Sequence, residues 1–312
     1  MNKKNLVFVK IFISLAILGI LLYKIGFKDI LNILSGMKLI YILPVVITMM
    51  ASNFIGGVNI KVLLRTFKIR ISPVKMFKLY SLSWAISLFV PSRLGELSIL
   101  YFLKKEKVKL GTASSVTILD KAISLIVVFL FAMMGLLIFL PGSQIIEITF
   151  IFVMAIIMLV FALYSEYTRR LARKMLGKYS KIFSGFYKSL IKIKKEGKES
   201  LLLDFFLTIV KWLVSTMVIF FLFISLNQKV PYLDVLLINS IVALIALAPV
   251  SISGNGVREY AAVVLFGKVG ISGGIVASAY IAGLIIRYLV GTIVIAWLIK
   301  KSDFTASGTP WK

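Results

Sequence analysis

Pro91-Ser92-Arg93-Leu94-Gly95-Glu96 is a short polar stretch between two apolar segments, and stretches of this kind decide how the chain can fold. The apolar segment before it, Leu79–Val90, has 12 residues, and the segment after it, Leu97–Leu103, has seven. A helix needs about 20 apolar residues to cross the hydrocarbon core of a bilayer. Neither segment is therefore long enough to span a membrane alone.

A second unit with the same order of features lies nearer the end of the chain. The apolar segment Val235–Ala248 is followed by a break from Pro249 to Glu259, and then by the septet Tyr260–Phe266. In each unit the order is the same. A longer apolar arm comes first, then a proline, then a polar break that contains glycine, arginine and glutamate, and last a shorter apolar arm. Each unit could form one broken transmembrane helix, or a re-entrant hairpin that enters and leaves the membrane by the same face.

The composition of the whole chain is that of an integral membrane protein. Of 312 residues, 60% are apolar and 16% charged, whereas a soluble domain averages about half and a quarter. The 37 basic residues against 12 acidic ones alternate with long apolar runs, which argues against nucleic-acid binding and for positively charged cytoplasmic loops. The absence of Cys and His excludes disulfides, thiol nucleophiles, Cys/His zinc sites and a histidine base.

Apolar runs long enough to span the membrane complete the fold prediction. We expect six of them, at Leu6–Leu22, Leu39–Val58, Thr112–Leu140, Ile145–Tyr164, Leu201–Leu226 and Gly274–Ile299. With the two broken units this gives eight hydrophobic segments. The predicted fold class is an all-α polytopic membrane protein.

The positions of the basic residues favour re-entrant hairpins over broken spans. Segment 59–78 carries six basic residues, 104–109 carries four and 165–200 carries eleven. If the first broken unit crossed the membrane, segments 59–78 and 165–200 would lie on opposite sides. If both units are re-entrant, all three segments and both termini lie on the cytoplasmic side, as the positive-inside rule requires.

Re-entry from opposite faces would relate the two halves of the chain by inversion in the membrane plane. The first half covers 39–140 and the second covers 201–300, within a single membrane domain that spans 1–301. Inverted repeats with broken helices at the midplane recur in secondary transporters. Segment 165–200 is then a basic cytoplasmic loop that attracts anionic lipids, and we expect residues 302–312 to form a disordered tail.

Charged residues at the breaks are the candidate site. Arg93 and Glu96 are three residues apart and can pair on one helix face. Arg258 and Glu259 are adjacent and point apart, so each needs another partner. Arg287 lies near the centre of its span, where an unpaired charge costs several kcal/mol, and we expect it to face protein and to pair with Glu259 or Glu96.

Residues around these charges are expected to support the site. Gly95, Gly254 and Gly256 precede the second arms, whose N-termini would attract an anion such as a lipid phosphate. Asp120 and Lys121 lie shallow enough in their span to reach toward the membrane interface, and Lys211 could do the same. The alternative interpretation is that the buried Arg–Glu pairs only fix the hairpins to neighbouring helices.

These motifs together resemble the lysylphosphatidylglycerol synthase transmembrane-domain, or flippase-like, family. The resemblance rests on Pro91 to Glu96, on Asp120-Lys121, on Gly254-Asn255-Gly256-Val257-Arg258-Glu259 and on the later Arg287, and covers roughly residues 5–300. Family members usually have Gly at the position of Ser92 and Glu-Arg in place of Asp120-Lys121. Lys keeps the charge of Arg but loses its bidentate reach.

The resemblance implies a membrane module for lipid translocation, with Arg93, Glu96, Arg258, Glu259 and Arg287 binding an anionic phospholipid or a polyprenyl-phosphate-linked head group. It predicts no enzyme activity, no catalytic residue, no cofactor and no metal. The alternatives are an integral membrane transferase acting on a lipid, or a non-transporting scaffold for a partner enzyme of lipid or glycan synthesis. The expected location is the cell membrane, with anionic lipids as partners.

Overall fold

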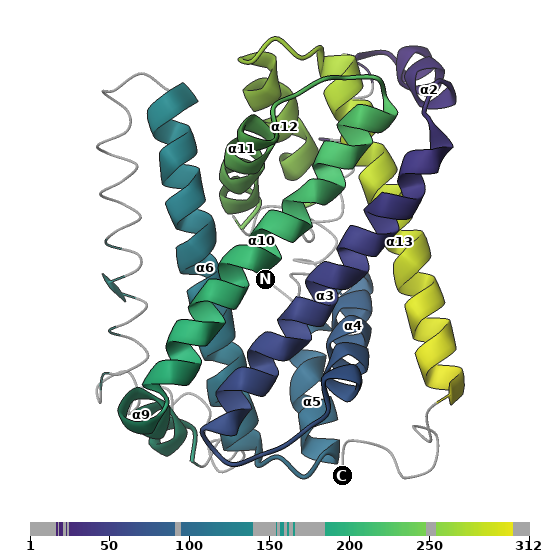
Figure 1. Ribbon diagram of the computed structural model, residues 1–312. Helices are drawn as coiled ribbons and strands as arrows, with labels where there is room; N and C mark the ends of the chain where they lie inside the picture. Colours follow the sequence, from purple (N-terminus) through teal and green to yellow (C-terminus); the bar gives the residue numbers. More distant parts are fainter. Residues whose placement is uncertain are drawn as a thin grey trace, which may run out of the picture.

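The computed structural model describes residues 25–90, 95–139, 185–247 and 254–301, together with isolated positions between 17 and 23 and between 154 and 165. The described residues form helices joined by short turns (Figure 1). In chain order these are α2 (Phe27–Ser35), the 3-10 turn η1 (Leu39–Tyr41), α3 (Ile42–Arg65), α4 (Pro73–Phe89), α5 (Ser98–Lys105), α6 (Leu110–Phe139), α9 (Phe186–Glu196), α10 (Lys198–Ser225), α11 (Tyr232–Ile245), α12 (Val257–Gly267) and α13 (Gly273–Lys301).

Four of the predicted spans are present as long apolar helices. Within the described residues, the helices long and apolar enough to cross a membrane are Leu39–Arg65, Leu110–Phe139, Lys198–Ser225 and Gly273–Leu298. The all-α membrane architecture is therefore confirmed. The other two predicted spans, Leu6–Leu22 and Ile145–Tyr164, lie mostly outside the described residues, as do most of the 165–200 loop and the 302–312 tail.

The arms of the two broken units are separate helices whose starts follow from local sequence. Helix α4 begins at Pro73, whose missing N–H costs nothing in a first turn, and the Ser72 hydroxyl accepts a hydrogen bond from the Lys75 N–H at 3.3 Å. Helix α12 begins after Gly256, which has φ 84°, a conformation that other residues rarely adopt.

Each broken unit folds back on itself through a glycine. A Cβ atom on Gly95 would lie 2.5 Å from Cα of Ser87, so the backbone after the first break packs directly on α4. In the second unit, a Cβ on Gly254 would lie 2.9 Å from Cβ of Ala246, at the end of α11. Both glycines follow their contact by eight residues. The two units thus share the same close return of the chain.

The two hairpins lie at opposite ends of the molecule. Figure 1 shows α4 and α5 near the lower end and α11 and α12 near the upper end, with α3, α10 and α13 running between these ends. One apolar cluster surrounds α4 and α5, with Leu103 and Val116 fully buried in it. Another surrounds α11 and α12, with Leu237 and Phe266 fully buried nearby. Each hairpin therefore has its own apolar packing.

Helix α13 packs against both hairpins. Ala279, Gly283 and Gly291 lie on the same face as Arg287, at four-residue steps, and all three are buried, which confirms that this face points toward protein. A Cβ on Gly283 would lie 2.9 Å from Leu222 of α10, and a Cβ on Gly291 would lie 2.6 Å from Leu88 of α4. Small residues allow this close approach of helices.

Replacing Gly95 by alanine should destabilise the fold. The new methyl group would meet the α4 backbone, which cannot move aside as a flexible side chain could, and overpacking of this kind costs about 1–3 kcal/mol. The purified protein in detergent should show a lower thermal midpoint. Gly267→Ala is the matched control, because nothing lies within 4 Å of a Cβ there. Equal midpoints for the two variants would contradict the close return at Gly95.

Candidate functional site

A polar cavity lies where the two hairpins approach each other. It has a volume of about 230 Å³ and is lined by residues of both hairpins and of α3, α10 and α13. The polar and aromatic lining residues are Ser52, Asn53, Trp84, Ser87, Glu96, Trp212, Ser215, Asn239, Asn255, Arg258, Arg287 and Tyr288. Three of the predicted site residues, Glu96, Arg258 and Arg287, are thus brought together, although they are far apart in the sequence.

Two arginines give this cavity its positive charge. Arg258 occupies the second position of α12, directly after the break. Arg287 comes from the middle of α13, where its Nε donates to the carbonyl oxygen of Gly283 at 3.0 Å. Their guanidinium groups are suited to a phosphate or carboxylate, since a planar fork can donate two parallel hydrogen bonds.

Glu259 stabilises the start of its own helix rather than lining the cavity. Its side chain is fully buried, and its Oε2 accepts a hydrogen bond from the Gly256 N–H at 2.6 Å. The positive N-terminus of α12, expected to attract an external anion, therefore already holds a carboxylate of the chain. In the part of the chain that the structure describes, Glu259 forms no ion pair, so of the two partners expected for Arg287, Glu259 is not one.

Tyr288 links the two breaks across the cavity. Its hydroxyl donates to the carbonyl oxygen of Leu88, at the end of the first arm of the first hairpin, at 3.0 Å. The same hydroxyl lies 3.5 Å from Nδ2 of Asn255, in the second break. One side chain of α13 thus contacts both hairpin tips.

Glu96 pairs with a lysine of α6. Its Oε2 lies 2.5 Å from Nζ of Lys121, so these two predicted residues meet. The predicted partner of Glu96, Arg93, lies outside the described residues, together with Pro91, Ser92 and Leu94. Lys121 thus places a positive charge directly beside the carboxylate of Glu96.

A known protein family matches this chain. One family model matches residues 7–295, and that family is described as the lysylphosphatidylglycerol synthase TM region. The chain belongs to this family. The match covers nearly the whole chain and confirms the resemblance seen in the two breaks; it also marks the chain as a membrane protein of a lipid-related family. A search among curated proteins finds no match.

The expectation that Asp120 and Lys211 reach toward the membrane interface is wrong. Asp120 is fully buried, and Nζ of Lys211 lies 3.7 Å from its Oδ1 and donates to the Ser124 hydroxyl at 3.0 Å. The Lys211 side chain is only 12% exposed. In this family member the attraction between the two opposite charges holds them inside the bundle.

Several buried polar residues were not predicted from the sequence. Asp204 and Thr208 of α10 and Asn59 of α3 are buried, and the Asn59 amide donates to the Thr208 hydroxyl at 2.7 Å. A signal was present in α10, because Asp204, Thr208, Lys211 and Ser215 recur at helical spacing on one face of an apolar span. Such a stripe indicates a helix face that turns toward other polar groups.

Within the described ranges, no group of three or more acidic side chains lies close enough to hold a metal ion. The chemistry that the cavity offers is the binding of an anion by guanidinium groups, beside the indole rings of Trp84 and Trp212.

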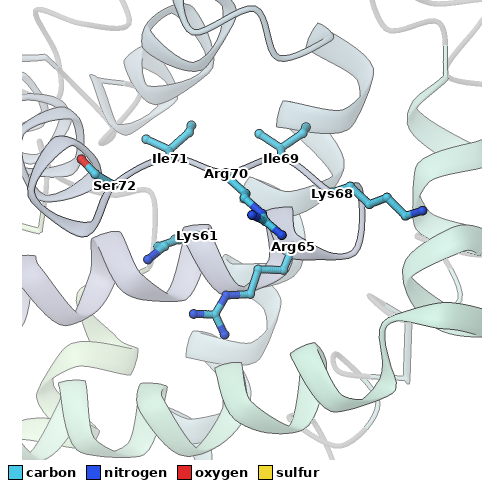
Figure 2. A pocket seen from close by; sticks show the side chains of 7 residues that line it. All are labelled: Lys61, Arg65, Lys68, Ile69, Arg70, Ile71 and Ser72. Carbon is cyan, nitrogen blue, oxygen red and sulfur yellow. The ribbon is translucent and has the colours of Figure 1, made fainter.

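A second hollow, rich in basic residues, lies where α3 ends. It has a volume of about 870 Å³ and is lined by Lys61, Arg65, Lys68, Ile69, Arg70, Ile71 and Ser72. Figure 2 shows Lys61 and Arg65 extending from α3, and Arg70 from the turn that follows. Across the described ranges, none of its four basic side chains forms an ion pair with an acid. Basic side chains at a helix end that have no acidic partner can attract an anionic lipid surface.

Removing the hydroxyl of Tyr288 should loosen the contact between the hairpins. Tyr288→Phe loses the hydrogen bond to Leu88 and the contact to Asn255, at a cost of about 1 kcal/mol in the free energy of unfolding. Thermal or denaturant unfolding in detergent would measure it. Tyr260→Phe serves as the control, because the Tyr260 side chain is 47% exposed on α12. Identical losses in both variants would show that Tyr288 does not hold the tips together.

Proposed function

We propose that the chain is a flippase-like transporter that moves an anionic phospholipid or a polyprenyl-phosphate-linked head group across the cell membrane, without enzyme activity of its own. The observation that carries the proposal is the cavity between the hairpins, where Arg258 and Arg287 supply positive charge inside a bundle of long apolar helices. Ionisable residues at such depth are costly to keep and usually belong to a transport pathway. Membership of the lysylphosphatidylglycerol synthase TM-region family supports a lipid as the cargo.

The proposed topology has six full spans and two re-entrant hairpins that form an inverted repeat, with both termini in the cytoplasm. Its support is the arrangement in Figure 1, where α4 starts and α5 ends at one end of the molecule, while α11 starts and α12 ends at the other. The lysines after α5 and those of α9 lie at the same end as the basic turn after α3. That end is the cytoplasmic one by the positive-inside rule.

The size of the cavity suits a head group rather than a whole lipid. Sites for drug-sized ligands have volumes of about 300–1,000 Å³, and this one has about 230 Å³. A phosphate with a small substituent fits such a space, while the acyl or prenyl chains stay in the bilayer. The arginines would replace the water that the phosphate leaves behind at the membrane surface.

The basic hollow after α3 would collect the anionic head group at the cytoplasmic surface. Lys61 and Arg65 line it from a helix that also contributes Ser52 and Asn53 to the central cavity. One helix thus carries the surface site and part of the central site. A partner enzyme of lipid or glycan synthesis would deliver or receive the lipid at this surface.

Loss of either cavity arginine should slow lipid movement. In liposomes that contain the full-length protein and a fluorescent phosphatidylglycerol, a membrane-impermeant quencher reports how much lipid reaches the outer leaflet. Arg258→Gln and Arg287→Gln should reduce the rate by about tenfold or more, since a hydrogen bond to a charged group contributes about 1.5–3 kcal/mol. Arg258→Lys should recover part of the rate by keeping the charge.

Lys268→Gln, which removes an exposed charge at the end of α12, is the control and should move lipid normally. Parallel liposomes with a labelled polyprenyl phosphate or a zwitterionic phosphatidylcholine would separate the candidate lipids. Normal movement in both arginine variants would contradict the proposal. Absence of movement for every lipid with the unaltered protein would favour the scaffold or the lipid transferase.

The basic hollow should hold anionic lipid after purification. The double variant Arg65→Gln, Arg70→Gln should retain less phosphatidylglycerol in native mass spectrometry, because each basic residue near an anionic surface contributes about 1 kcal/mol. The matched control is Lys107→Gln, Lys109→Gln, which removes two exposed charges at the same end of the molecule. Equal retention in the two double variants would reduce the hollow to ordinary surface charge.

A further inference from the structure

A second polar cluster lies inside the bundle, between α3, α6 and α10. Asp120 and Lys211 lie in it with the amide of Asn59 and the hydroxyl of Thr208. Asp204, one turn before Thr208 on α10, belongs to it because it interacts electrostatically with Asp120 and Lys211. Both aspartates are fully buried. Nδ2 of Asn59 lies 3.4 Å from Oδ1 of Asp120 and donates to Thr208 at 2.7 Å.

The charges of this cluster do not balance when every group is ionised. Lys211 is one ammonium group against two carboxylates, and it lies 3.7 Å from Asp120. Among the described residues, both carboxylate oxygens of Asp204 and Oδ2 of Asp120 are buried without a hydrogen-bond partner. A buried unpaired carboxylate costs several kcal/mol, whereas a carboxylic acid is neutral and can donate. Two carboxylates that share one cation therefore favour keeping one proton.

Other charged groups that act on the cluster are few. In the described part of the chain, the ionisable side chains that act electrostatically on Asp204 or Lys211 from outside the cluster are Tyr80 of α4 and Lys121 of α6. Helix α3 presents the neutral Asn59, and α9 presents the hydroxyl of Ser189 to Thr112 of α6. Lys121 also acts on Asp120, but its own ammonium group is paired with Glu96.

A small cavity lies between Asp120 and two residues that also line the central cavity. It has a volume of about 30 Å³, enough for a water molecule, and its polar lining residues are Tyr80, Ser83, Glu96, Thr117, Asp120 and Lys121. Glu96 and Trp84 line both this space and the central cavity. A line of ionisable groups thus runs from Asp204 through Asp120 and the Lys121–Glu96 pair to the arginines.

We propose that Asp120, Asp204 and Lys211 form a proton-binding site that holds one proton and is linked electrostatically to the central cavity through Lys121 and Glu96. The proton comes from solvent, binds a carboxylate oxygen and leaves by the reverse step. The link deepens the proposed function by naming the proton as the coupling ion. The proton site itself does not depend on lipid movement.

Infrared spectroscopy of the purified full-length protein would test the site without any lipid transport. The C=O stretch of a protonated carboxylic acid should be present in the unaltered protein and should disappear when the pH of the buffer is raised far enough. Asp204→Asn should abolish it, and so should Asp120→Asn, because in each variant Lys211 then neutralises the remaining acid. Lys211→Gln should increase the band by roughly twofold, since both acids then keep a proton.

Glu199→Gln is the control, because Glu199 is exposed in the first turn of the same helix, α10, and its loss should leave the band unchanged. Absence of the band in the unaltered protein, or its persistence in both aspartate variants, would overturn the site. Since each aspartate variant has nearly the shape of the original, a thermal melt of each verifies that the fold is retained.

The link to the central cavity has its own test in the same titration. Glu96→Gln leaves Lys121 without its counter-ion, and the added positive charge should favour the ionised carboxylate. The band should therefore disappear at lower pH than in the unaltered protein. The same midpoint in Glu96→Gln and Glu199→Gln would show that the site is isolated from the cavity. A failure of lipid movement would count against the proposed function only.

Discussion

The constraint on which this structure depends is the cost of placing charged groups inside a bundle of apolar helices. Each such group must find a partner within the protein. Glu259 accepts from the Gly256 N–H, Lys121 pairs with Glu96, and Lys211 lies beside Asp120. Because these contacts join segments far apart in the chain, they fix the interior arrangement more tightly than apolar packing alone, which tolerates repacking.

The two hairpins pack at opposite ends of the molecule, and this leaves their polar residues inside the protein. Each packs in its own apolar cluster, so the polar residues of the breaks are left to face one another in the space between the clusters. Helix α13 completes the arrangement, since its small residues approach α4 and α10 while Tyr288 contacts both breaks. A polar cavity forms where the tips of these two short helix pairs come together inside the bundle.

The apolar runs were sufficient to predict the long helices and the arms of the hairpins, because run length and proline positions control both. The sequence also led us to expect Arg287 near one of the two break glutamates, and it lines the same cavity as Glu96. The partners of individual charged residues could not be predicted from the sequence. Glu259 accepts a hydrogen bond from the backbone of its own helix start, and Lys211 lies beside the buried Asp120. Such choices depend on distances between helices, and a single sequence does not encode these in any local pattern. Asp204 was missed because a lone acid near a span end looks like an interfacial residue.

The small volume between the hairpins also bears on selectivity. In the proposed function, a chamber of this size admits only the polar moiety of an amphiphile, and the hydrocarbon part stays in the bilayer. Discrimination would then depend on the chemistry of the polar moiety and be almost blind to tail length, branching or unsaturation. A single protein of this design could serve two-tailed glycerolipids and long isoprenoid carriers alike, and changes in membrane fatty-acid composition would leave its preference unaltered.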